Sequence, residues 1–159
     1  MDLKAKTTAL RGFSYGVYIV GSRNPEGDVN AFLGTWVTQT SFDPPMVAIA
    51  VKQGTTSQQM VAASGVFTVN VLETGQKDLA ARFFKPVTRV GNKFDGLEFY
   101  TAETGSPILK DALSFLECRV VERIERGDHF VYLGEIINAG VHREGESLGL
   151  RETGWKYGG

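Results

Sequence analysis

The sequence predicts an all-β protein with short helices, folded as an antiparallel barrel or sandwich. About six apolar runs rich in β-branched and aromatic residues alternate with turn signals along the chain. These runs do not alternate regularly with helical patterns, as they would around a parallel sheet. Neither a GxGxxG nor a GxxxxGK[ST] motif is present, so a bound nucleotide would need a scaffold other than a Rossmann fold.

The N-terminal part of the chain predicts a short helix followed by a strand pair. Residues 3–10 can form the helix, and residues 15–20 (YGVYIV) and 29–33 (VNAFL) indicate the strands. Residues 24–28 (NPEGD) predict the turn between the strands, because proline restricts φ and glycine accepts a positive φ.

The middle of the chain predicts a buried strand and a capped helix. Two consecutive prolines break the chain before the apolar run 46–51 (MVAIAV), which is short enough for a buried strand. Thr56 and Gln59 have the spacing of a capping box. We therefore expect a short helix to begin there and to end near residue 64.

The second half of the chain predicts three more strands. Residues 66–72 (VFTVNVL) alternate in polarity, which predicts a half-buried strand with its threonine and asparagine on the opposite face from its apolar residues. Residues 114–124 and 129–139 indicate the other two strands. A second short helix is expected over residues 78–84, and the stretch 87–107 is expected to be rich in loops.

Length and composition bound the class of protein. The 159 residues fit one domain, expected to span residues 1–159, and 42 % hydrophobic with 22 % charged residues argue against disorder. A formal net charge of −1 argues against a nucleic-acid partner, which usually needs a basic face. No apolar run approaches the ~18 residues of a membrane span, and no signal-peptide pattern follows the first residues.

The cysteine and histidine content predicts a cytoplasmic protein without a metal site. Cys118 is the only cysteine, which excludes an internal disulfide and favours a buried, inert thiol. His129 and His142 are too few for an all-histidine metal site. A mixed site of histidine and carboxylate ligands stays open, although no ligand-spaced cluster supports it. His142 has charged neighbours and is expected at the surface.

Five short motifs follow one another along the chain: SFDPP (41–45), SGVFTVNVL (64–72), GSPILKDAL (105–113), LEC (116–118) and GDH (127–129). Each motif alone is weak, but their order and spacing resemble those of the flavin-reductase-like family of FMN-binding split barrels. The resemblance covers the chain from about Leu10 to Tyr157. The chain is most similar to the flavin-reductase-like module at the C-terminus of some diflavin flavoproteins, which shares a tryptophan-containing segment and the ending Gly154-x-x-Tyr157.

This resemblance implies a six-stranded antiparallel Greek-key barrel that forms a homodimer. It places FMN in a groove near the subunit interface, with FAD as the alternative flavin. It also implies reduction of the flavin by NADH or NADPH, and electron transfer to a monooxygenase or another acceptor.

A polar segment between two apolar strands is the first candidate for flavin contact. On residue types alone it could be a solvated loop, but its backbone and hydroxyls could also bind the pyrimidine edge of a flavin, whose polar atoms lose water on binding. The resemblance favours the flavin cradle. Many relatives have two serines where this chain has Thr35 and Trp36, and an indole is large enough to stack on a ring or to fill the pocket. The predicted cradle residues are Thr35, Trp36, Val37, Thr38, Gln39, Thr40 and Ser41.

The FMN phosphate is expected beside four residues that follow a buried strand and open a helix. A helix N-terminus presents free N–H groups and positive potential, which favour an anion. An ordinary helix cap is the alternative, and the resemblance makes a dual role reasonable. The predicted phosphate contacts are Lys52, Thr55, Thr56 and Ser57.

Lys93 and Phe94 lie in Asn92-Lys93-Phe94, where many relatives have Asp-Arg-Phe. The resemblance therefore predicts that Lys93 reaches the phosphate as a point charge. Lysine is a poorer bidentate partner than arginine, so a looser contact is expected. A solvated loop lysine is the alternative interpretation.

Three residues in the C-terminal part of the chain complete the predicted site. His129 opens the last long strand, and the resemblance places it where the nicotinamide docks, to position that ring or to protonate a flavin nitrogen. A simple turn residue is the alternative. Trp155 and Tyr157 could cap a flavin or a partner groove, or anchor the tail on the core.

Together these observations predict a flavin reductase, an enzyme that transfers hydride from NADH or NADPH to FMN. A flavin-bound electron carrier that serves a protein partner is the alternative. A flavin-binding domain without turnover is a third and weaker interpretation.

Overall fold

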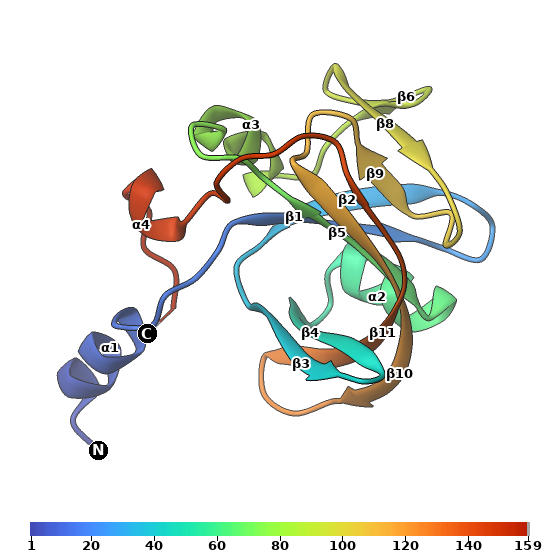
Figure 1. The fold of residues 1–159 in the computed structure, drawn as a ribbon. Coiled ribbons are helices and arrows are strands. Elements are labelled where there is room, and N and C mark those ends of the chain that lie inside the picture. The colour runs from blue at the N-terminus through green and yellow to red at the C-terminus, as the bar shows by residue number, and fades with distance from the viewer. Residues whose placement is uncertain (159) are drawn as a thin grey trace.

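The structure is a computed structural model that describes residues 1–158, and antiparallel strands dominate it (Figure 1). The helices are α1 (Leu3–Arg11), α2 (Thr56–Ser64), α3 (Lys77–Ala81), the 3-10 helix η1 (Arg82–Phe84) and α4 (Leu150–Thr153). The strands are β1 (Tyr18–Arg23), β2 (Val29–Gly34), β3 (Val37–Phe42), β4 (Pro45–Lys52), β5 (Val66–Val71), β6 (Arg89–Val90), β7 (Lys93–Phe94), β8 (Leu97–Thr101), β9 (Pro107–Leu109), β10 (Ser114–Ile124) and β11 (His129–Val141). No helix within residues 1–158 is long and apolar enough to cross a membrane.

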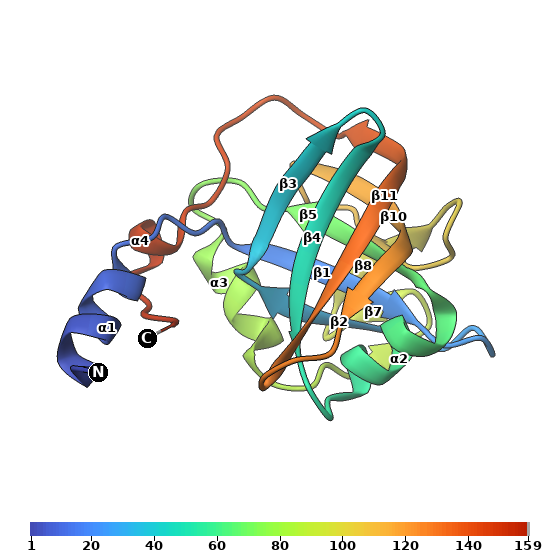
Figure 2. The same ribbon diagram turned by 90° about the horizontal axis from the view of Figure 1, so that it is seen from below.

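Seven strands form one curled sheet in the order β2-β1-β5-β10-β11-β4-β3, and each neighbouring pair is antiparallel. Figure 2 shows β3, β4, β11 and β10 running side by side across one side of the molecule. The strands β6 to β9 form a second, four-stranded sheet. The antiparallel all-β class is therefore confirmed. The six-stranded Greek-key split barrel is not confirmed in detail, because the large sheet has seven strands and its edges β2 and β3 do not pair.

Two segments predicted as loops contain strands. Strand β3 pairs with β4, with Val37 opposite Ile49, although most of its side chains are exposed. An exposed edge strand can be polar throughout, so its composition resembled that of a loop. Within residues 87–107, β6 and β7 have only two residues each, which is too short to show an alternating pattern.

The local signals for turns and caps are mostly confirmed. In the β1–β2 turn the Asn24 N–H donates to the Asp28 carbonyl at 2.9 Å, and Gly27 has φ of 93°. The cap of α2 is displaced by one residue from the prediction, because Thr55 rather than Thr56 accepts a hydrogen bond from Gln58 N at 3.2 Å. The spacing Thr-x-x-Gln occurs at both positions, so the sequence could not distinguish them.

Strand β5 is buried on both faces, which corrects the prediction of a half-buried strand. Thr68 and Asn70 are 0 % exposed because β9 covers them. The Thr68 hydroxyl donates to the Pro107 carbonyl at 2.6 Å, and the Asn70 amide bonds both Ile19 O and Leu109 N. These hydrogen bonds satisfy the buried polar atoms, so a polar face could be covered without a large cost.

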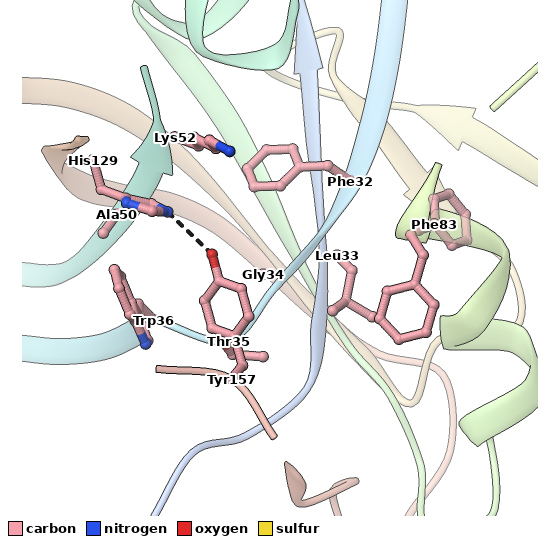
Figure 3. Close-up of a pocket in the computed structure, with 11 residues that line it drawn as sticks. Phe32, Leu33, Gly34, Thr35, Trp36, Ala50, Lys52, Phe83, His129 and Tyr157 are labelled. Atoms are coloured by element: carbon pink, nitrogen blue, oxygen red, sulfur yellow. Dashed lines mark hydrogen bonds between the residues drawn. The ribbon is translucent and has the colours of Figure 1, made fainter. Parts of the chain in front are cut away.

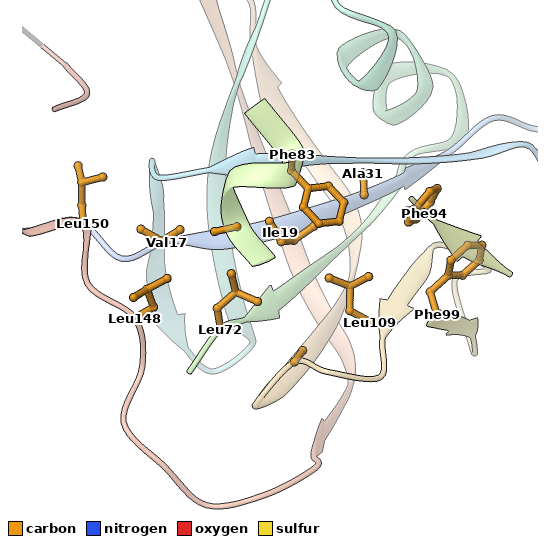
Figure 4. Close-up of a cluster of buried hydrophobic side chains, with 12 residues drawn as sticks. Val17, Ile19, Ala31, Leu72, Phe83, Phe94, Phe99, Leu109, Leu148 and Leu150 are labelled. Atoms are coloured by element: carbon orange, nitrogen blue, oxygen red, sulfur yellow. The ribbon is translucent and has the colours of Figure 1, made fainter. Parts of the chain in front are cut away.

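The two faces of the sheet carry separate apolar clusters. One cluster joins β1 and β2 to η1 and the small sheet, and Figure 4 shows Phe83, Phe94 and Phe99 within it. The other cluster centres on Phe67 and Tyr132, both 0 % exposed, and is covered by α2. The Tyr132 hydroxyl accepts a 2.9 Å hydrogen bond from the Gln58 amide of α2, which ties the helix to the sheet.

Candidate functional site

Strand register brings three predicted site residues to one end of the sheet. Lys52, the last residue of β4, lies directly opposite His129, the first residue of β11. The Ala50 N–H donates to the Trp36 carbonyl at 3.0 Å, which holds Trp36 beside the same strand end. Three residues that are far apart in sequence therefore line one pocket (Figure 3).

This pocket has a volume of about 200 Å³ and combines aromatic, cationic and small residues. The end of β2 and the residues after it form one wall, and β4 and β11 form a second. The 3-10 helix η1 and the C-terminal segment complete the lining. The lining residues are Phe32, Leu33, Gly34, Thr35, Trp36, Ala50, Lys52, Phe83, Phe84, His129 and Tyr157.

His129 is held from both sides of its ring. Its Nδ1 lies 3.0 Å from a carboxylate oxygen of Asp128, and its Nε2 forms a 3.1 Å hydrogen bond with the Tyr157 hydroxyl. The hydrogen bond and charge of His129 lower the pKa of Asp128. Burial, with a smaller contribution from the charge of Asp128, raises the pKa of Tyr157. The imidazole is therefore oriented by a carboxylate and linked to a neutral phenol.

The rings of Trp36, His129 and Tyr157 form an aromatic cluster in the pocket. The Trp36 ring centroid lies 4.6 Å from that of His129 and 5.3 Å from that of Tyr157. These separations are typical of favourable aromatic contacts. The cluster provides a surface on which a planar heteroaromatic ring can stack.

Three buried polar atoms in or beside this cluster have no hydrogen-bond partner among the described residues. They are the Thr35 hydroxyl, the Trp36 indole nitrogen and His129 Nδ1, whose contact with Asp128 is an ion pair. Thr35 is only 4 % exposed. An unsatisfied buried polar atom is costly, and native proteins rarely leave one without a reason. Their position in the pocket wall indicates a polar ligand.

A second, larger hollow of about 740 Å³ adjoins the pocket and shares Thr35, Trp36 and Ala50 with it. Phe13 and Tyr15, which follow α1, form part of its wall, and β3 and β4 form another part. Trp36 is therefore a common wall between two cavities.

The structure separates the predicted cradle residues into two groups. Thr35 and Trp36 line the pocket, whereas the other five follow along β3, away from it. Val37 and Thr38 line the second hollow, and Thr40 lines a groove on the outer side of β4 and β11. The Gln39 amide donates to the Ser41 carbonyl at 3.2 Å, and neither of these two residues lines a pocket among those described.

Of the four predicted phosphate residues, only Lys52 lines the pocket. The Thr55 hydroxyl caps α2 and donates to the Lys52 carbonyl at 2.9 Å. Thr56 is exposed at the first position of α2, and Ser57 is buried and accepts a 3.0 Å hydrogen bond from Asn30. The ordinary helix cap is therefore the structural role of Thr55.

Lys93, Phe94 and Trp155 lie outside the pocket lining. The Lys93 ammonium forms a 3.5 Å ion pair with Glu98, and Phe94 is 1 % exposed in the core. Phe94 packs edge-on against Phe83, so it supports the pocket wall from behind. Trp155 contacts Phe84 with ring centroids 4.5 Å apart, which anchors the C-terminal segment on the other wall residue of η1.

Several pocket residues were not predicted from the sequence. Phe83 is 4 % exposed, whereas its neighbour Phe84 is 56 % exposed at the pocket. Two adjacent phenylalanines at a helix end cannot both face the core, and this was a signal for an exposed aromatic residue. Asp128 was noted only as part of the motif GDH (127–129), and its contact with His129 was not predicted. The remaining unpredicted lining residues are Phe32, Leu33, Gly34 and Ala50.

The other titratable candidates do not form a second chemical centre. Cys118 is 0 % exposed, and burial together with the charge of Glu117 raises its pKa to about 12, which agrees with the predicted inert thiol. His142 bonds the Tyr100 hydroxyl and the Ala112 carbonyl at the surface. Within residues 1–158, no three histidine, cysteine or acidic side chains gather to hold a metal ion.

Comparison with known families identifies the chain. The family described as "Flavin reductase like domain" matches residues 10–155. The chain belongs to the flavin-reductase-like family. The predicted resemblance is thus confirmed over nearly the whole sequence.

Relatives of this flavin-reductase-like chain differ in length. It is 35 % identical over 135 residues to "Diflavin flavoprotein A 1" of Synechocystis sp., which is 84 % of this chain and 23 % of that protein. The chain thus spans about a quarter of that relative's length. It is 31 % identical over 140 residues to "FMN reductase (NADH)" of Agrobacterium fabrum, covering 88 % of this chain and 77 % of the relative.

Solved structures include a similar fold in the NADH:FAD oxidoreductase of Streptomyces globisporus. The two structures superimpose with a TM-score of 0.72 at 30 % identity, covering 86 % of this flavin-reductase-like chain and 82 % of the other.

Proposed function

We propose that the chain is an NAD(P)H-dependent flavin reductase that holds FMN in the pocket of Trp36, Lys52 and His129. One observation supports this proposal most directly. Aromatic rings, unsatisfied buried polar atoms and a lysine lie together in one pocket. Relatives named FMN reductase (NADH) and NADH:FAD oxidoreductase support a flavin reductase with a nicotinamide donor.

The chemistry of the pocket residues fits a flavin mononucleotide. Trp36 and His129 offer faces for a tricyclic ring, and the Thr35 hydroxyl and Trp36 N–H can bond its polar edge. Lys52 forms no ion pair among the described residues and can bind a phosphate. FAD stays the alternative flavin, because the second hollow beyond Trp36 offers further space.

Bound FMN would supply the capacity to accept a hydride from the nicotinamide, and the chain supplies orientation and shelter. The Asp128 carboxylate orients the His129 ring through Nδ1, so that Nε2 faces the pocket. His129 can then position the nicotinamide or hold a proton at Nε2. The apolar walls from β2 and η1 exclude water from the space where the two rings meet.

The direct test is the absorption spectrum of the purified protein and titration with FMN. We expect a yellow protein, or quenching of FMN fluorescence with micromolar affinity or better. Anaerobic addition of NADH or NADPH to the FMN-loaded protein should then bleach the flavin. Absence of FMN binding at tens of micromolar contradicts the proposal. FMN binding without bleaching by either nicotinamide supports instead an electron carrier for a protein partner.

The Lys52→Ala variant tests the phosphate contact. It should weaken FMN binding by about 1.5–3 kcal/mol, since a charge-assisted hydrogen bond is lost. Riboflavin binding should not change, because riboflavin has no phosphate. Lys93→Ala is the matched control, because Lys93 pairs with Glu98 outside the pocket and its loss should affect neither ligand. Equal losses of FMN and riboflavin in Lys52→Ala would exclude the phosphate contact.

A further inference from the structure

We propose that Tyr157 is a displaceable ring that controls the entry of a planar redox ring into the pocket. This inference rests on the proposed function and adds a specificity-determining residue to it. In this structure Tyr157 occupies the place against Trp36 and His129 where the flavin or nicotinamide ring would stack (Figure 3). The entering ring must therefore compete with Tyr157.

The contacts of Tyr157 are those that a bound ring would make. Its ring centroid lies 5.3 Å from that of Trp36 and 6.5 Å from that of His129. Its hydroxyl bonds His129 Nε2 at 3.1 Å, which is the nitrogen that faces the pocket. Figure 3 shows its ring in the middle of the pocket, between Trp36 and Leu33. A single tyrosine thus uses both the stacking surface and the polar atom of His129.

Within the pocket, Tyr157 takes up space that an entering ring would need. The remaining volume of about 200 Å³ lies below the roughly 300–1,000 Å³ of typical ligand pockets, although a larger hollow adjoins it beyond Trp36. The hydroxyl of Thr35 in the same wall has no hydrogen-bond partner among the described residues, although Thr35 is 96 % buried. A ligand in place of Tyr157 could gain both the space and the unsatisfied polar atom.

The C-terminal segment can release Tyr157 without unfolding any helix or strand. Trp155 is anchored by its ring contact with Phe84 and by Lys77, whose ammonium lies 5.7 Å from the Trp155 ring centroid. Beyond Trp155, residues 156–158 form no backbone hydrogen bond with the described part of the chain. Tyr157 is 44 % exposed, and the following Gly158 has φ of 97°. Its side-chain contacts therefore hold this segment in the pocket, and segments held in this way open at low cost.

Competition with Tyr157 predicts the direction in which the binding affinity of a ligand should change. A ring that binds only when Tyr157 has left shows an apparent affinity reduced by the fraction of open molecules. Weakening the hold of Tyr157 should therefore tighten ligand binding. If Tyr157 were instead a stacking partner of the bound ring, its removal should weaken binding.

The experiment compares Tyr157→Ala and Tyr157→Phe with wild type in two binding titrations. One arm adds FMN to the flavin-free protein, and the other adds NAD⁺ or NADP⁺ to the FMN-loaded protein. Tyr157→Phe loses only the hydrogen bond to His129 and should tighten binding roughly fivefold in at least one arm. Tyr157→Ala also loses the ring contacts and should tighten the same arm roughly tenfold or more. The arm that responds identifies which ring displaces Tyr157.

Tyr100→Phe is the matched control, because Tyr100 forms a 2.9 Å hydrogen bond with His142 outside the pocket. It should change neither titration. A readout independent of flavin uses the Trp155→Phe background, in which Trp36 is the only tryptophan. There, Tyr157→Ala should increase quenching of Trp36 fluorescence by acrylamide.

The proposal that an entering ring displaces Tyr157 is overturned if the Tyr157 variants bind equally or more weakly in both titrations. It is also overturned if the quenching of Trp36 fluorescence is unchanged. This result is separate from failure of the proposed function. If wild-type protein does not bind FMN, the flavin proposal fails. If wild type binds FMN and the Tyr157 variants bind equally well, only the role of Tyr157 fails.

Discussion

The structure shows contacts of His129 that the sequence did not predict. As a lone histidine after Gly127-Asp128 it could have been a simple turn residue. The structure gives it a carboxylate partner on Nδ1, a phenol on Nε2 and a tilted indole ring in contact with its own ring. A turn residue needs none of these three contacts, so the surroundings favour a role at the site.

The His129→Ala variant should slow flavin reduction by nicotinamide roughly tenfold, because one oriented hydrogen-bonding group is lost at the second substrate. FMN affinity should stay nearly intact, because the Trp36 ring, the Thr35 hydroxyl and the Lys52 ammonium remain in the pocket. Stopped-flow bleaching of the FMN-loaded variant, compared with its melting temperature, measures both properties. If reduction kinetics stay at the wild-type rate while stability and FMN affinity fall together, His129 has only a structural role.

Glu117 lies in the motif LEC (116–118), but that motif did not predict that its carboxylate is buried. It is 0 % exposed and accepts hydrogen bonds from both the N–H and hydroxyl of Thr104, from Glu103 N and from the Asn138 amide. Burial alone would raise the pKa of Glu117, but these hydrogen bonds outweigh it and hold the pKa below its usual value. The ionised carboxylate therefore ties the loop before β9 to β10 and β11.

The stabilisation by Glu117 should depend on pH. Because its folded-state pKa is lowered, the contribution is fully present above the usual value of 4.5 and is lost as pH falls through the folded-state pKa. Glu117→Gln should lower stability by roughly 2 kcal/mol at neutral pH, and this difference should shrink in acid. Thermal melts of both proteins across the acid range test this, with the exposed Glu122→Gln as control. A difference that stays constant with pH would contradict the expected role.

At the scale of elements, the packing of side chains from β5 and β10 over β11 depends on one small residue. A Cβ atom at Gly134 of β11 would lie 2.6 Å from the Phe67 ring and 2.9 Å from the Cys118 Cβ. Both neighbours are 0 % exposed in a packed core and cannot move freely. A glycine is thus required at this position because the Phe67 ring lies directly against the backbone of β11.

Gly134→Ala should destabilise the protein by about 1–3 kcal/mol through overpacking. Denaturant unfolding measures the loss. The double variant Gly134→Ala/Phe67→Leu should lose less free energy of unfolding than the two single variants lose together. The smaller leucine side chain leaves room for the methyl group of the alanine. Strictly additive losses would show that Gly134 acts through another contact.

At the scale of the whole molecule, β3 and β10 carry exposed apolar residues. Phe42 is 90 % exposed, and Val121 and Ile124 are 49 % and 56 % exposed. Ile124 also lines a groove of about 310 Å³ together with residues of β4 and β11. Strand β3 is also an unpaired sheet edge, which proteins usually cover or protect. These features support the predicted homodimer, which stays a prediction.

Light scattering at micromolar concentration should therefore give the mass of a dimer. Ile124→Glu should shift the protein toward monomer with its circular dichroism unchanged, because a charge would be buried in an apolar contact. Glu125→Lys, a charge change at the neighbouring exposed position, serves as the control. A wild-type monomer that still binds FMN contradicts the predicted dimer.

The sequence by itself determined the class of fold and the family. Local signals act over a few residues, so the antiparallel strands, the turn at residues 24–28 and the capped start of α2 were predictable from spacing and residue type. Lys52, Trp36 and His129 were predictable as candidates because the family resemblance pointed to their motifs. Polar β3 and the two-residue strands β6 and β7 were not predictable, because pairing with neighbours rather than local pattern makes them strands.

Only the tertiary structure decided which candidates meet. Register between β4 and β11 sets Lys52 opposite His129, and the path of the C-terminal segment brings Tyr157 to both His129 and Trp36. The same packing turns Ser57 and Phe94 into the interior and pairs Lys93 with Glu98. Most of these contacts join residues separated by tens of positions, and their geometry depends on how the sheet curls. No local sequence pattern encodes this geometry. The sequence could therefore predict candidate residues of the site, but not which of them lie together.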